Sequence, residues 1–285
     1  MKVVVVGDAG LDVVARHENA IVQGGDSRAS VRLAGGGAGA NTALWLASTG
    51  VETTLIARVG DDAGGRLIRS ELESAGVRCA FTVDEDAATC CVVVLVDKDG
   101  QRSMLPDRGA NARFAPSDVL ASALDGAAHL HLSGYVLLDP SSRPGGLAAL
   151  AAAREAGLTT SVDPQAAALL TDPAGFLDDV RGADLLLPNA DELRALAGSD
   201  GPEALLDFVG AVAVTAGMEG ARWVDGDGTV SVPAEPADCV DSTGAGDAFD
   251  AGVLSARLAG QSTVDALRAG VRLGAKAVGQ VGAQP

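Results

Sequence analysis

The sequence predicts an α/β fold in which a mostly parallel sheet is covered by helices on both faces. Short apolar runs alternate along the chain with alanine-rich segments of helical periodicity. Strands that are buried on both faces read as continuous apolar runs, and parallel neighbours are joined by crossover helices. With 285 residues and 47% hydrophobic content, the chain is long enough for one large domain core.

Each expected strand is a short apolar run that stops at a polar residue or a glycine. The N-terminal run is too short for a signal peptide or a membrane span, so we expect a soluble protein. The expected strands are Lys2–Gly7, Thr53–Gly60, Ala127–Gly134, Leu158–Asp163, Ala183–Asn189 and Gly210–Gly217. The expected helices are Gly39–Gly50, Asp62–Gly76, Gly145–Gly157 and Ala190–Gly198.

Two segments interrupt this alternation. Residues Leu11–Ala34 show no helical period, and Thr89–Pro106 reads as two strands around a turn at Asp97–Gly100. We expect them to form a small, mostly antiparallel sheet that acts as a lid over the carboxyl edge of the main sheet, where ligands bind in open α/β folds. Residues 1–285 then form a single domain with a discontinuous lid from about 11–34 and 89–106.

Charge and cysteine content exclude several classes of partner. The formal net charge of −17 repels nucleic-acid phosphates and anionic lipids, so we expect neither a nucleic acid nor a membrane as partner. Aromatic residues make up only 3%, which leaves few platforms for stacked bases. The four cysteines lack the spacing of a zinc site or a disulfide framework, as expected for buried, reduced thiols of a cytoplasmic protein.

The segment "DSTGAGDAF" places a glycine-rich turn directly before a good helix. Gly244, Ala245 and Gly246 therefore lie at a helix N-terminus, where free backbone N–H groups and the helix dipole favour an anion. Small residues let a phosphate approach these amides closely, without help from a lysine. The segment predicts an anion cradle that is built from backbone alone.

The acids of this helix start need a separate explanation. Asp247 would repel a phosphate unless it acts on a substrate hydroxyl as a general base, or holds a cation. It is equally typical of an ordinary first-turn acid that favours the helix dipole, and position alone does not decide between the two. We interpret Asp250, one turn later, as a plain first-turn charge without a chemical role.

Three further motifs each allow two interpretations. "GGGAGAN" ends in Asn41 and is either a tight turn or the place where a polyhydroxy ligand approaches the backbone. In "PNADE", Asn189 and Glu192 form either a helix-capping pair or a water-mediated Mg²⁺ contact. "VTAGMEG" is either a nucleotide-lining turn or a hairpin loop before the next strands.

Two nucleotide-binding motifs are missing or poor. The chain has no GxxxxGK[ST] sequence, which excludes an ordinary P-loop enzyme. The dinucleotide fingerprint fits only in a relaxed form at Gly35–Ala40, and the segment before it is a poor first strand. A nicotinamide-dependent oxidoreductase is therefore a remote alternative.

Taken together, the chain resembles the ribokinase-like (PfkB) carbohydrate kinases. The motifs "GDAGLD", "GGGAGAN", "RVGDDAGG", "PNADE", "VTAGMEG" and "DSTGAGDAF" occur in the family's order over almost the whole chain. The resemblance implies a three-layer αβα sandwich with a small β-sheet lid. It also implies an ATP- and Mg²⁺-dependent phosphotransferase that acts on a hydroxymethyl group of a sugar, a nucleoside or a related compound.

The resemblance assigns a role to each motif residue. Asp247 would be the base, and Gly244, Ala245 and Gly246 the anion hole. The residues expected to serve Mg·ATP are Asn189, Glu192 (on Mg²⁺ through water), Thr215, Gly217 and Gly220. The residues expected to hold the acceptor are Asp12, Gly36, Gly37 and Asn41. Asp241 and Thr243 lie where K⁺-binding members supply cation ligands, and that loop would finish at the C-terminal "GAQP".

Two departures from the ribokinase pattern concern the acceptor. Gly10 stands where that pattern has Asn, and Ala38 where it has Lys, which argues against ribose itself. Arg102 and Arg108 near the lid either meet a polar or acidic acceptor or are solvated charges. A nucleoside kinase of the adenosine or pseudouridine type, and a catalytically silent nucleotide- or sugar-binding regulator, are the alternatives. An exposed lid sheet also favours a homodimer.

Overall fold

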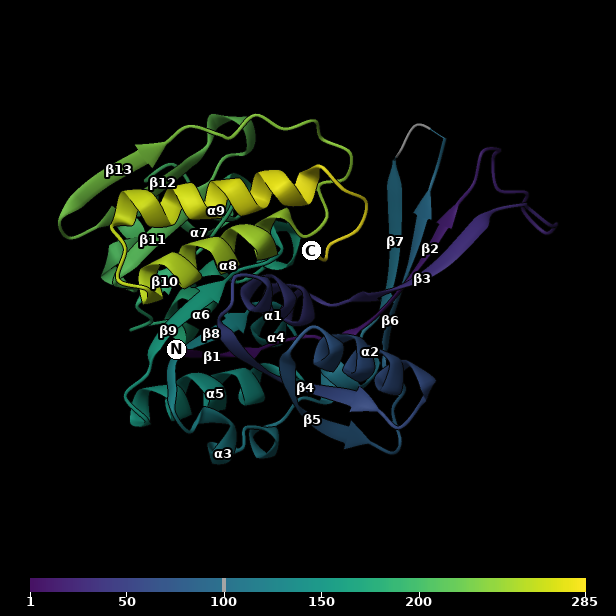
Figure 1. Ribbon diagram of the computed structural model, residues 1–285, viewed down its shortest axis with the longest axis horizontal. Coiled ribbons are helices and arrows are strands. Elements are labelled where there is room, and N and C mark those ends of the chain that lie inside the picture. Colours follow the sequence, from purple (N-terminus) through teal and green to yellow (C-terminus); the bar gives the residue numbers. More distant parts are fainter. Residues whose placement is uncertain (99–100) are drawn as a thin grey trace.

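A computed structural model describes residues 1–98 and 101–285 of the chain. Its main body is a nine-stranded sheet in the order β13-β12-β11-β10-β9-β8-β1-β4-β5 (Figure 1). All neighbours from β11 to β5 pair in parallel, and β12 and β13 add an antiparallel edge. The strands are β1 Lys2–Val6, β4 Glu52–Gly60, β5 Val77–Asp84, β8 Ala127–Ser133, β9 Thr159–Asp163, β10 Leu185–Leu186, β11 Ala211–Thr215, β12 Ala221–Asp225 and β13 Gly228–Val232.

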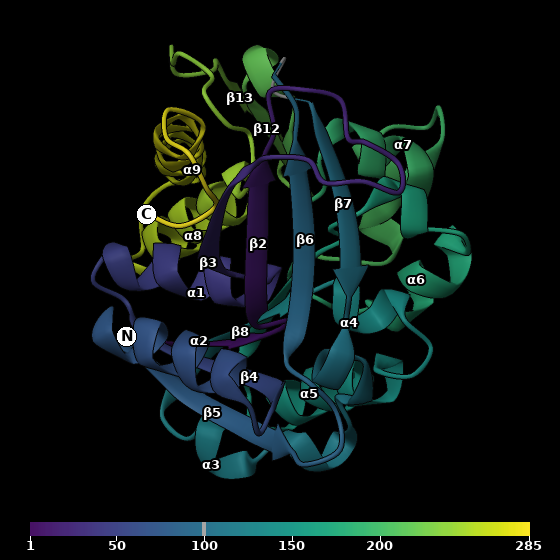
Figure 2. The ribbon, with the colours of Figure 1, turned by 90° about the vertical axis from the view of Figure 1, so that its right-hand side faces the viewer.

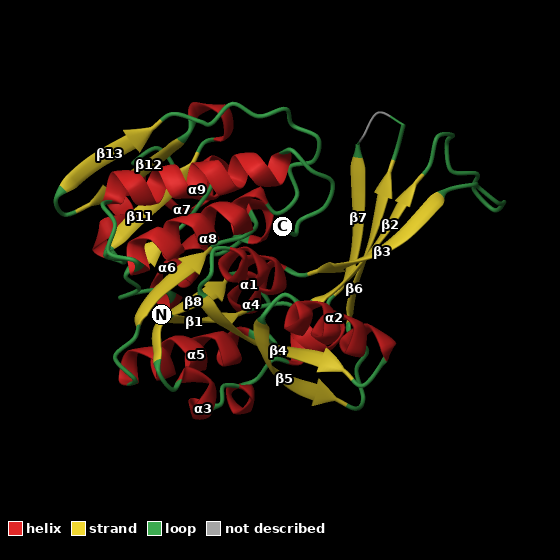
Figure 3. Cartoon of the chain, viewed as in Figure 1, coloured by secondary structure: helices red, strands yellow, loops and turns green. Residues whose placement is uncertain are grey.

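Helices cover both faces of this sheet (Figure 3), as the sequence predicts. One layer holds α1 Ala38–Ser48, α2 Ala63–Ser74, α8 Ala245–Leu258 and α9 Thr263–Val278. The other holds α3 Ala121–Leu124, α4 Tyr135–Leu138, α5 Arg143–Glu155, α6 Pro173–Asp179 and α7 Ala190–Ala197. A hydrophobic core lies on each face of the sheet, and alternate residues of β1 point into the two cores. Val3 and Val5 pack with the first layer of helices, and Val4 and Val6 pack with the second.

A second sheet of four strands stands beside the main body (Figure 2), in the order β3-β2-β6-β7. Its strands are β2 Gly10–Arg16, β3 Ser30–Gly36, β6 Cys90–Val96 and β7 Arg102–Asp107. The outer pairs are antiparallel and the central β2·β6 pair is parallel, so the sheet is mostly antiparallel as expected. The predicted turn at Asp97–Gly100 falls partly on residues 99–100, which lie outside the described residues.

Within the described residues, none of the helices is long and apolar enough to cross a membrane. All four cysteines are free thiols, but the expectation that they are buried holds for Cys90 alone, since Cys79 and Cys91 are half-buried and Cys239 is exposed. Burial raises the pKa of Cys79 and of Cys90 to about 12, which leaves both thiols protonated and unreactive at neutral pH.

Candidate active site

The glycine-rich turn forms the start of α8. Gly244 is its N-cap and has a left-handed backbone with φ 74°, which favours glycine. A Cβ on Gly244 would lie 2.5 Å from the carbonyl oxygen of Ala283, so the position has no room for a side chain. Among the residues that the structure describes, no side chain caps this helix start, and a Cβ on Gly246 would meet nothing within 4 Å. The first turn of α8 therefore faces open space and keeps amides for a ligand.

Asp247 is the first acid of α8 and is only 8% exposed. Its carboxylate accepts hydrogen bonds from Asn41 Nδ2 and Thr42 Oγ1 of α1, both at 3.2 Å. Burial raises the pKa of Asp247 to about 6, although the hydrogen bonds from Asn41, Gln165 and Thr42 oppose this rise. The carboxylate is therefore ionised at neutral pH but is a stronger base than an exposed aspartate, which suits general-base chemistry.

Behind Asp247 lies a buried acid pair that sequence reasoning missed. Asp163 ends β9 and is 6% exposed, and Asp250 of α8 is 1% exposed. Burial raises the pKa of Asp163, and the charges of Glu192 and Asp247 raise it further. Burial and the charge of Asp163 likewise raise the pKa of Asp250. Two buried carboxyls in contact cannot both ionise, so the pair holds a proton.

The interpretation of Asp250 as a plain first-turn charge is wrong. Because α8 begins at Ala245, Asp250 lies in its second turn and faces the sheet rather than solvent. Its Oδ2 lies 3.8 Å from Nε2 of His131 on β8, and both atoms are buried without a hydrogen-bond partner among the described residues. Burial lowers the pKa of His131 to about 3, so this histidine is neutral.

Gln165 was not singled out in the sequence. It follows the end of β9 and, at φ 72°, is the non-glycine residue with a positive φ among those described. Its Nε2 donates to Asp163 Oδ2 at 2.6 Å, and its side chain also hydrogen-bonds Asp247. A strained backbone of this kind persists only where surrounding contacts hold it, and here those contacts are the two carboxylates.

Asn189 and Glu192 form the capping box of α7. Asn189 Oδ1 accepts from the backbone N–H of Asp191 and of Glu192, and Glu192 Oε2 accepts from the N–H of Asn189 at 2.8 Å. Both carboxylate oxygens are used, because Glu192 Oε1 also accepts from Asn189 Nδ2 at 2.6 Å. The charge of Glu192 nevertheless lies close enough to Asp163 to raise the pKa of Asp163. The capping interpretation thus holds, and the Mg²⁺ interpretation stays a prediction.

The predicted nucleotide-lining residues lie at the end of β11. Thr215 is the last residue of that strand and pairs with Asn189 across an isolated bridge, so the two motifs are neighbours. Gly217 and Gly220 both have a positive φ and enclose a tight turn that is closed by a hydrogen bond from Ala216 N to Gly220 O. The antiparallel β12 follows, so the segment is also the hairpin loop of the alternative interpretation.

The four predicted acceptor residues come together where the small sheet meets α1. A Cβ on Gly36 of β3 would lie 2.5 Å from Asp12 Oδ1 on β2, and Gly37 is the N-cap of α1 at φ 93°. Asn41 follows in the first turn of α1 and reaches Asp247. Burial raises the pKa of Asp12 to about 6, and the charge of Arg32 opposes this.

The C-terminal segment closes the same region. Asp241 Oδ1 accepts from the N–H of Thr243, and its Oδ2 accepts from the N–H of Gly282 at 3.1 Å. Trp45 Nε1 donates to Ala283 O at 2.9 Å. An open cleft lies between these loops and the small sheet. Its lining includes Asp12, Arg16, Arg32, Asp241, Thr243 and Gly282.

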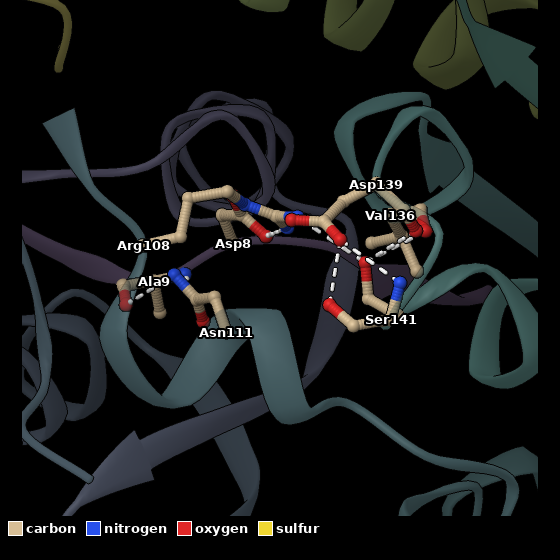
Figure 4. Close-up of polar contacts among 8 residues, drawn as sticks. Asp8, Ala9, Arg108, Asn111, Val136, Asp139 and Ser141 are labelled. Atoms are coloured by element: carbon tan, nitrogen blue, oxygen red, sulfur yellow. Dashed lines mark hydrogen bonds and ion pairs between the residues drawn. The ribbon is translucent and has the colours of Figure 1, made fainter.

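Arg108 lies where β7 leaves the small sheet, and Figure 4 shows it between two carboxylates. Its Nη2 lies 2.9 Å from Asp8 Oδ1 and its Nη1 lies 2.8 Å from Asp139 Oδ2. Asn111 nearby exchanges hydrogen bonds with the backbone of Ala9. The guanidinium of Arg108 is thus engaged by the protein itself. The side chain of Arg102 lies outside what the structure describes.

The sequence matches known proteins over its whole length. Residues 1–285 match the pfkB family carbohydrate kinases. The chain is 35% identical to the ATP-dependent ribose-1-phosphate kinase of Halopiger xanaduensis, over all of this chain and 94% of that relative. It is 30% identical to the aminoimidazole riboside kinase of Salmonella typhimurium, over 89% of this chain and 80% of that relative.

Solved structures agree with the sequence relatives. The adenosine kinase from Sinorhizobium meliloti superimposes with a TM-score of 0.89 at 25% identity, over 100% of this chain and 95% of that one. The Salmonella enterica aminoimidazole riboside kinase, complexed with aminoimidazole riboside and an ATP analogue, gives 0.82 at 26% identity, over 99% and 95%. The chain belongs to the pfkB family of carbohydrate kinases. Its fold is the ribokinase-like αβα sandwich with a small accessory sheet, and it is a phosphotransferase of that family.

Proposed function

We propose that this protein uses ATP to phosphorylate a hydroxymethyl group of a sugar or a related small molecule, with Asp247 as the general base. The observation that carries the proposal is the position of Asp247. It is a buried carboxylate with a pKa of about 6, directly inside a glycine turn that faces open space. A base and an anion cradle on adjacent residues are what a hydroxyl nucleophile and a phosphoryl group require.

In the proposed step, Asp247 takes the proton of the acceptor hydroxyl. The hydroxyl oxygen bonds to the γ-phosphorus of ATP as the bond to the bridging oxygen breaks, and ADP leaves. The amides of Gly244, Ala245 and Gly246 stabilise the transferring group, since backbone donors at a helix start need no reorganisation. Asn41 and Thr42 orient the carboxylate through their hydrogen bonds.

Mg·ATP would lie along the ends of β9, β10 and β11. Thr215, Gly217 and Gly220 would line the nucleotide, while Asn189 and Glu192 would serve its phosphates. The mutual charges of Glu192, Asp163 and Asp247 fit a nearby divalent cation, which would relieve their repulsion. Among the described residues no three acidic, histidine or cysteine ligands converge. Mg²⁺ would therefore take most of its ligands from water and phosphate.

A monovalent cation would bind at the loop of Asp241 and Thr243. The two hydrogen bonds of Asp241 join this loop to the C-terminal segment, so the loop's carbonyl groups are held in place. If K⁺ is bound there, activity in KCl should exceed activity in NaCl of equal ionic strength. Equal rates in the two salts would remove K⁺ from the proposal.

Asp12, Gly36, Gly37 and Asn41 would hold the acceptor hydroxyls. The names of the relatives suggest ribose 1-phosphate, aminoimidazole riboside and fructose as first candidates. Gly10 and Ala38 still argue against free ribose. Gly10 is confined by the backbone of Cys90, because a Cβ there would lie 2.5 Å from the Cys90 oxygen.

The test is a coupled ADP-release screen over sugars, sugar phosphates and nucleosides, repeated with Asp247→Asn. Loss of the base should lower kcat by roughly 10²- to 10⁴-fold, while ATP binding by calorimetry stays near wild type. Turnover by Asp247→Asn at a near-normal rate contradicts the assigned role. No turnover by the wild type with any acceptor, despite tight ATP binding, favours the silent regulator.

The small sheet is also the proposed dimer surface. Val31 and Leu33 of β3 and Leu105 of β7 are about 60% exposed on one face of it (61%, 61% and 60%). Large exposed apolar side chains on a sheet favour a partner. Leu33→Ser with Leu105→Ser should turn a dimer into a monomer in light scattering, and a monomeric wild type contradicts this. The free thiols fit the cytoplasm as the site of action.

A further inference from the structure

Two arginines of the small sheet line the open cleft that also contains Asp12. Arg16 ends β2 and Arg32 lies in β3, and both line the cleft together with Asp12 and Thr243. In the antiparallel β2·β3 pair, Asp12 lies opposite Ala34, Val14 opposite Arg32, and Arg16 opposite Ser30. Residues at alternate positions share a face, so both arginines project from the face that carries Asp12.

The two arginines are diagonal neighbours on that face. Such positions lie about 7–8 Å apart, which long side chains bridge easily. Like charges so close together destabilise a sheet unless something neutralises them. In the part of the chain that the structure describes, neither guanidinium has a carboxylate oxygen within ion-pair distance, in contrast to Arg108, which contacts two. The charge of Arg32 does lower the pKa of Asp12, and Asp241 lines the same cleft, but neither arginine forms a close ion pair among the described residues, so both keep N–H donors for a ligand.

Arg32 also reaches toward the anion cradle. A Cβ on Gly282 would lie 3.7 Å from Arg32 Nη2, and the next residue, Ala283, packs against Gly244. Along β2, the row of Arg32 lies about 7 Å beyond the row of Asp12, at roughly 3.4 Å per residue. Asp12 thus occupies the inner end of the cleft, where hydroxyls would bind, and the arginines occupy its outer part.

We propose that Arg16 and Arg32 form a subsite for a phosphate group that the acceptor already carries. The substrate class is then a sugar phosphate with a free hydroxymethyl group, and the product is a sugar bisphosphate. This inference rests on the proposed kinase function and specifies its acceptor. Two planar guanidinium groups suit a phosphate dianion, because each offers paired N–H donors to two of its oxygens.

The test compares ribose with ribose 1-phosphate in the ADP-release assay. The wild type should prefer the phosphate ester, and Arg16→Gln or Arg32→Gln should each lower kcat/KM for it by about 10- to 100-fold. Turnover of any neutral acceptor should be unchanged. Arg32→Lys keeps the positive charge but loses the paired N–H donors of the guanidinium, so its kcat/KM for ribose 1-phosphate should lie between those of the wild type and Arg32→Gln. Arg268→Gln, an exposed arginine of α9 away from the cleft, is the matched control and should behave as wild type.

Binding without turnover separates this inference from the kinase proposal. Calorimetry should show that ribose 1-phosphate binds the wild type and that Arg32→Gln weakens this binding by a similar factor. If binding depends on the arginines but no acceptor releases ADP, the subsite stands and the kinase proposal fails. If only acceptors without a phosphate group are phosphorylated, the phosphate subsite is overturned while the kinase proposal stands. Equal losses on neutral and phosphorylated acceptors would also overturn it.

Discussion

The main body and the small sheet differ in how firmly the protein holds their charged groups. On the side of the main sheet, Asp163, Asp247 and Asp250 are at most 8% exposed and contact one another or neighbouring side chains. On the side of the small sheet, Arg16 and Arg32 are exposed. The proposed base, Asp247, is therefore held in place by the protein core. The arginines proposed to select the acceptor lie on the surface, where substitutions should leave the fold intact.

The largest effect is expected in the main body, at Gly244. Gly244→Ala would force a methyl group onto the Ala283 carbonyl and shift the cradle, so kcat/KM should fall by about 100-fold or more. Gly50→Ala is the control, because Gly50 also has a positive φ but its Cβ would meet nothing within 4 Å. It should cost stability without loss of activity. Equal activity of the two variants would show that the cradle tolerates displacement.

The second effect is on the pH profile. Since the pKa of Asp247 is raised to about 6, the base is ionised above this pH and loses its charge below it. At pH 5 only about one tenth of the sites would be ionised, so kcat/KM should fall roughly tenfold from its value at pH 7. Steady-state rates from pH 5 to 8 measure this limb. A flat profile across that range would contradict the assignment of the base.

The third effect is on stability, because removing the proposed base should stabilise the folded protein. Folding raises the pKa of Asp247 from 3.8 to about 6, so the folded state is destabilised as pH rises through this window and carries the full cost above it. Asp247→Asn should therefore raise the free energy of unfolding at pH 8 by about 1–3 kcal/mol. The gain should vanish near pH 4. Urea unfolding at both pH values provides the measurement, and an unstable variant at pH 8 would refute the prediction.

The smallest effect is expected in the small sheet, at Arg32. Arg32→Gln should change the free energy of unfolding by no more than about 0.5 kcal/mol, since the side chain is exposed and forms no ion pair among the described residues. Thermal melts of this variant and of Arg268→Gln should overlay. A clear loss of stability in Arg32→Gln alone would mean that the small sheet, too, depends on its charged groups.

The sequence was sufficient for the features that depend on local pattern. Apolar runs and helical periods predict the layered sheet, and the glycine turn before α8 predicts the open helix start. The expected strand at Ala183–Asn189 shortens to Leu185–Leu186, because the following residues leave the ladder to cap α7. β5 and α9 were not anticipated. Arg78, Thr82 and Asp84 interrupt the apolar run of β5, and α9 follows α8 after a connection of only four residues.

The parts of the site that sequence could not show depend on distant contacts. Thr42 reaches Asp247 only because α1 and α8 pack together. Asp163 ends a parallel strand, which was an available signal, since such ends meet at one edge of the sheet. Nothing in the sequence near Asp250 distinguishes it from a surface acid. For Asn189 and Glu192 the local pattern is explained fully by the capping box of α7. The same pattern therefore cannot reveal whether the two residues also serve Mg²⁺.

The hydrogen bonds around Asp247 have a consequence for how the protein folds. Asn41 and Asp247 are 206 residues apart, and Gln284 reaches Asn41 across 243 residues. Contacts of such sequence separation form after local structure, because their loop-closure entropy must be overcome first. Helix content should therefore return early during refolding from urea, and enzymatic activity should return last. Catalysis by this protein is thus a reporter of complete folding, more demanding than any spectroscopic signal from its helices.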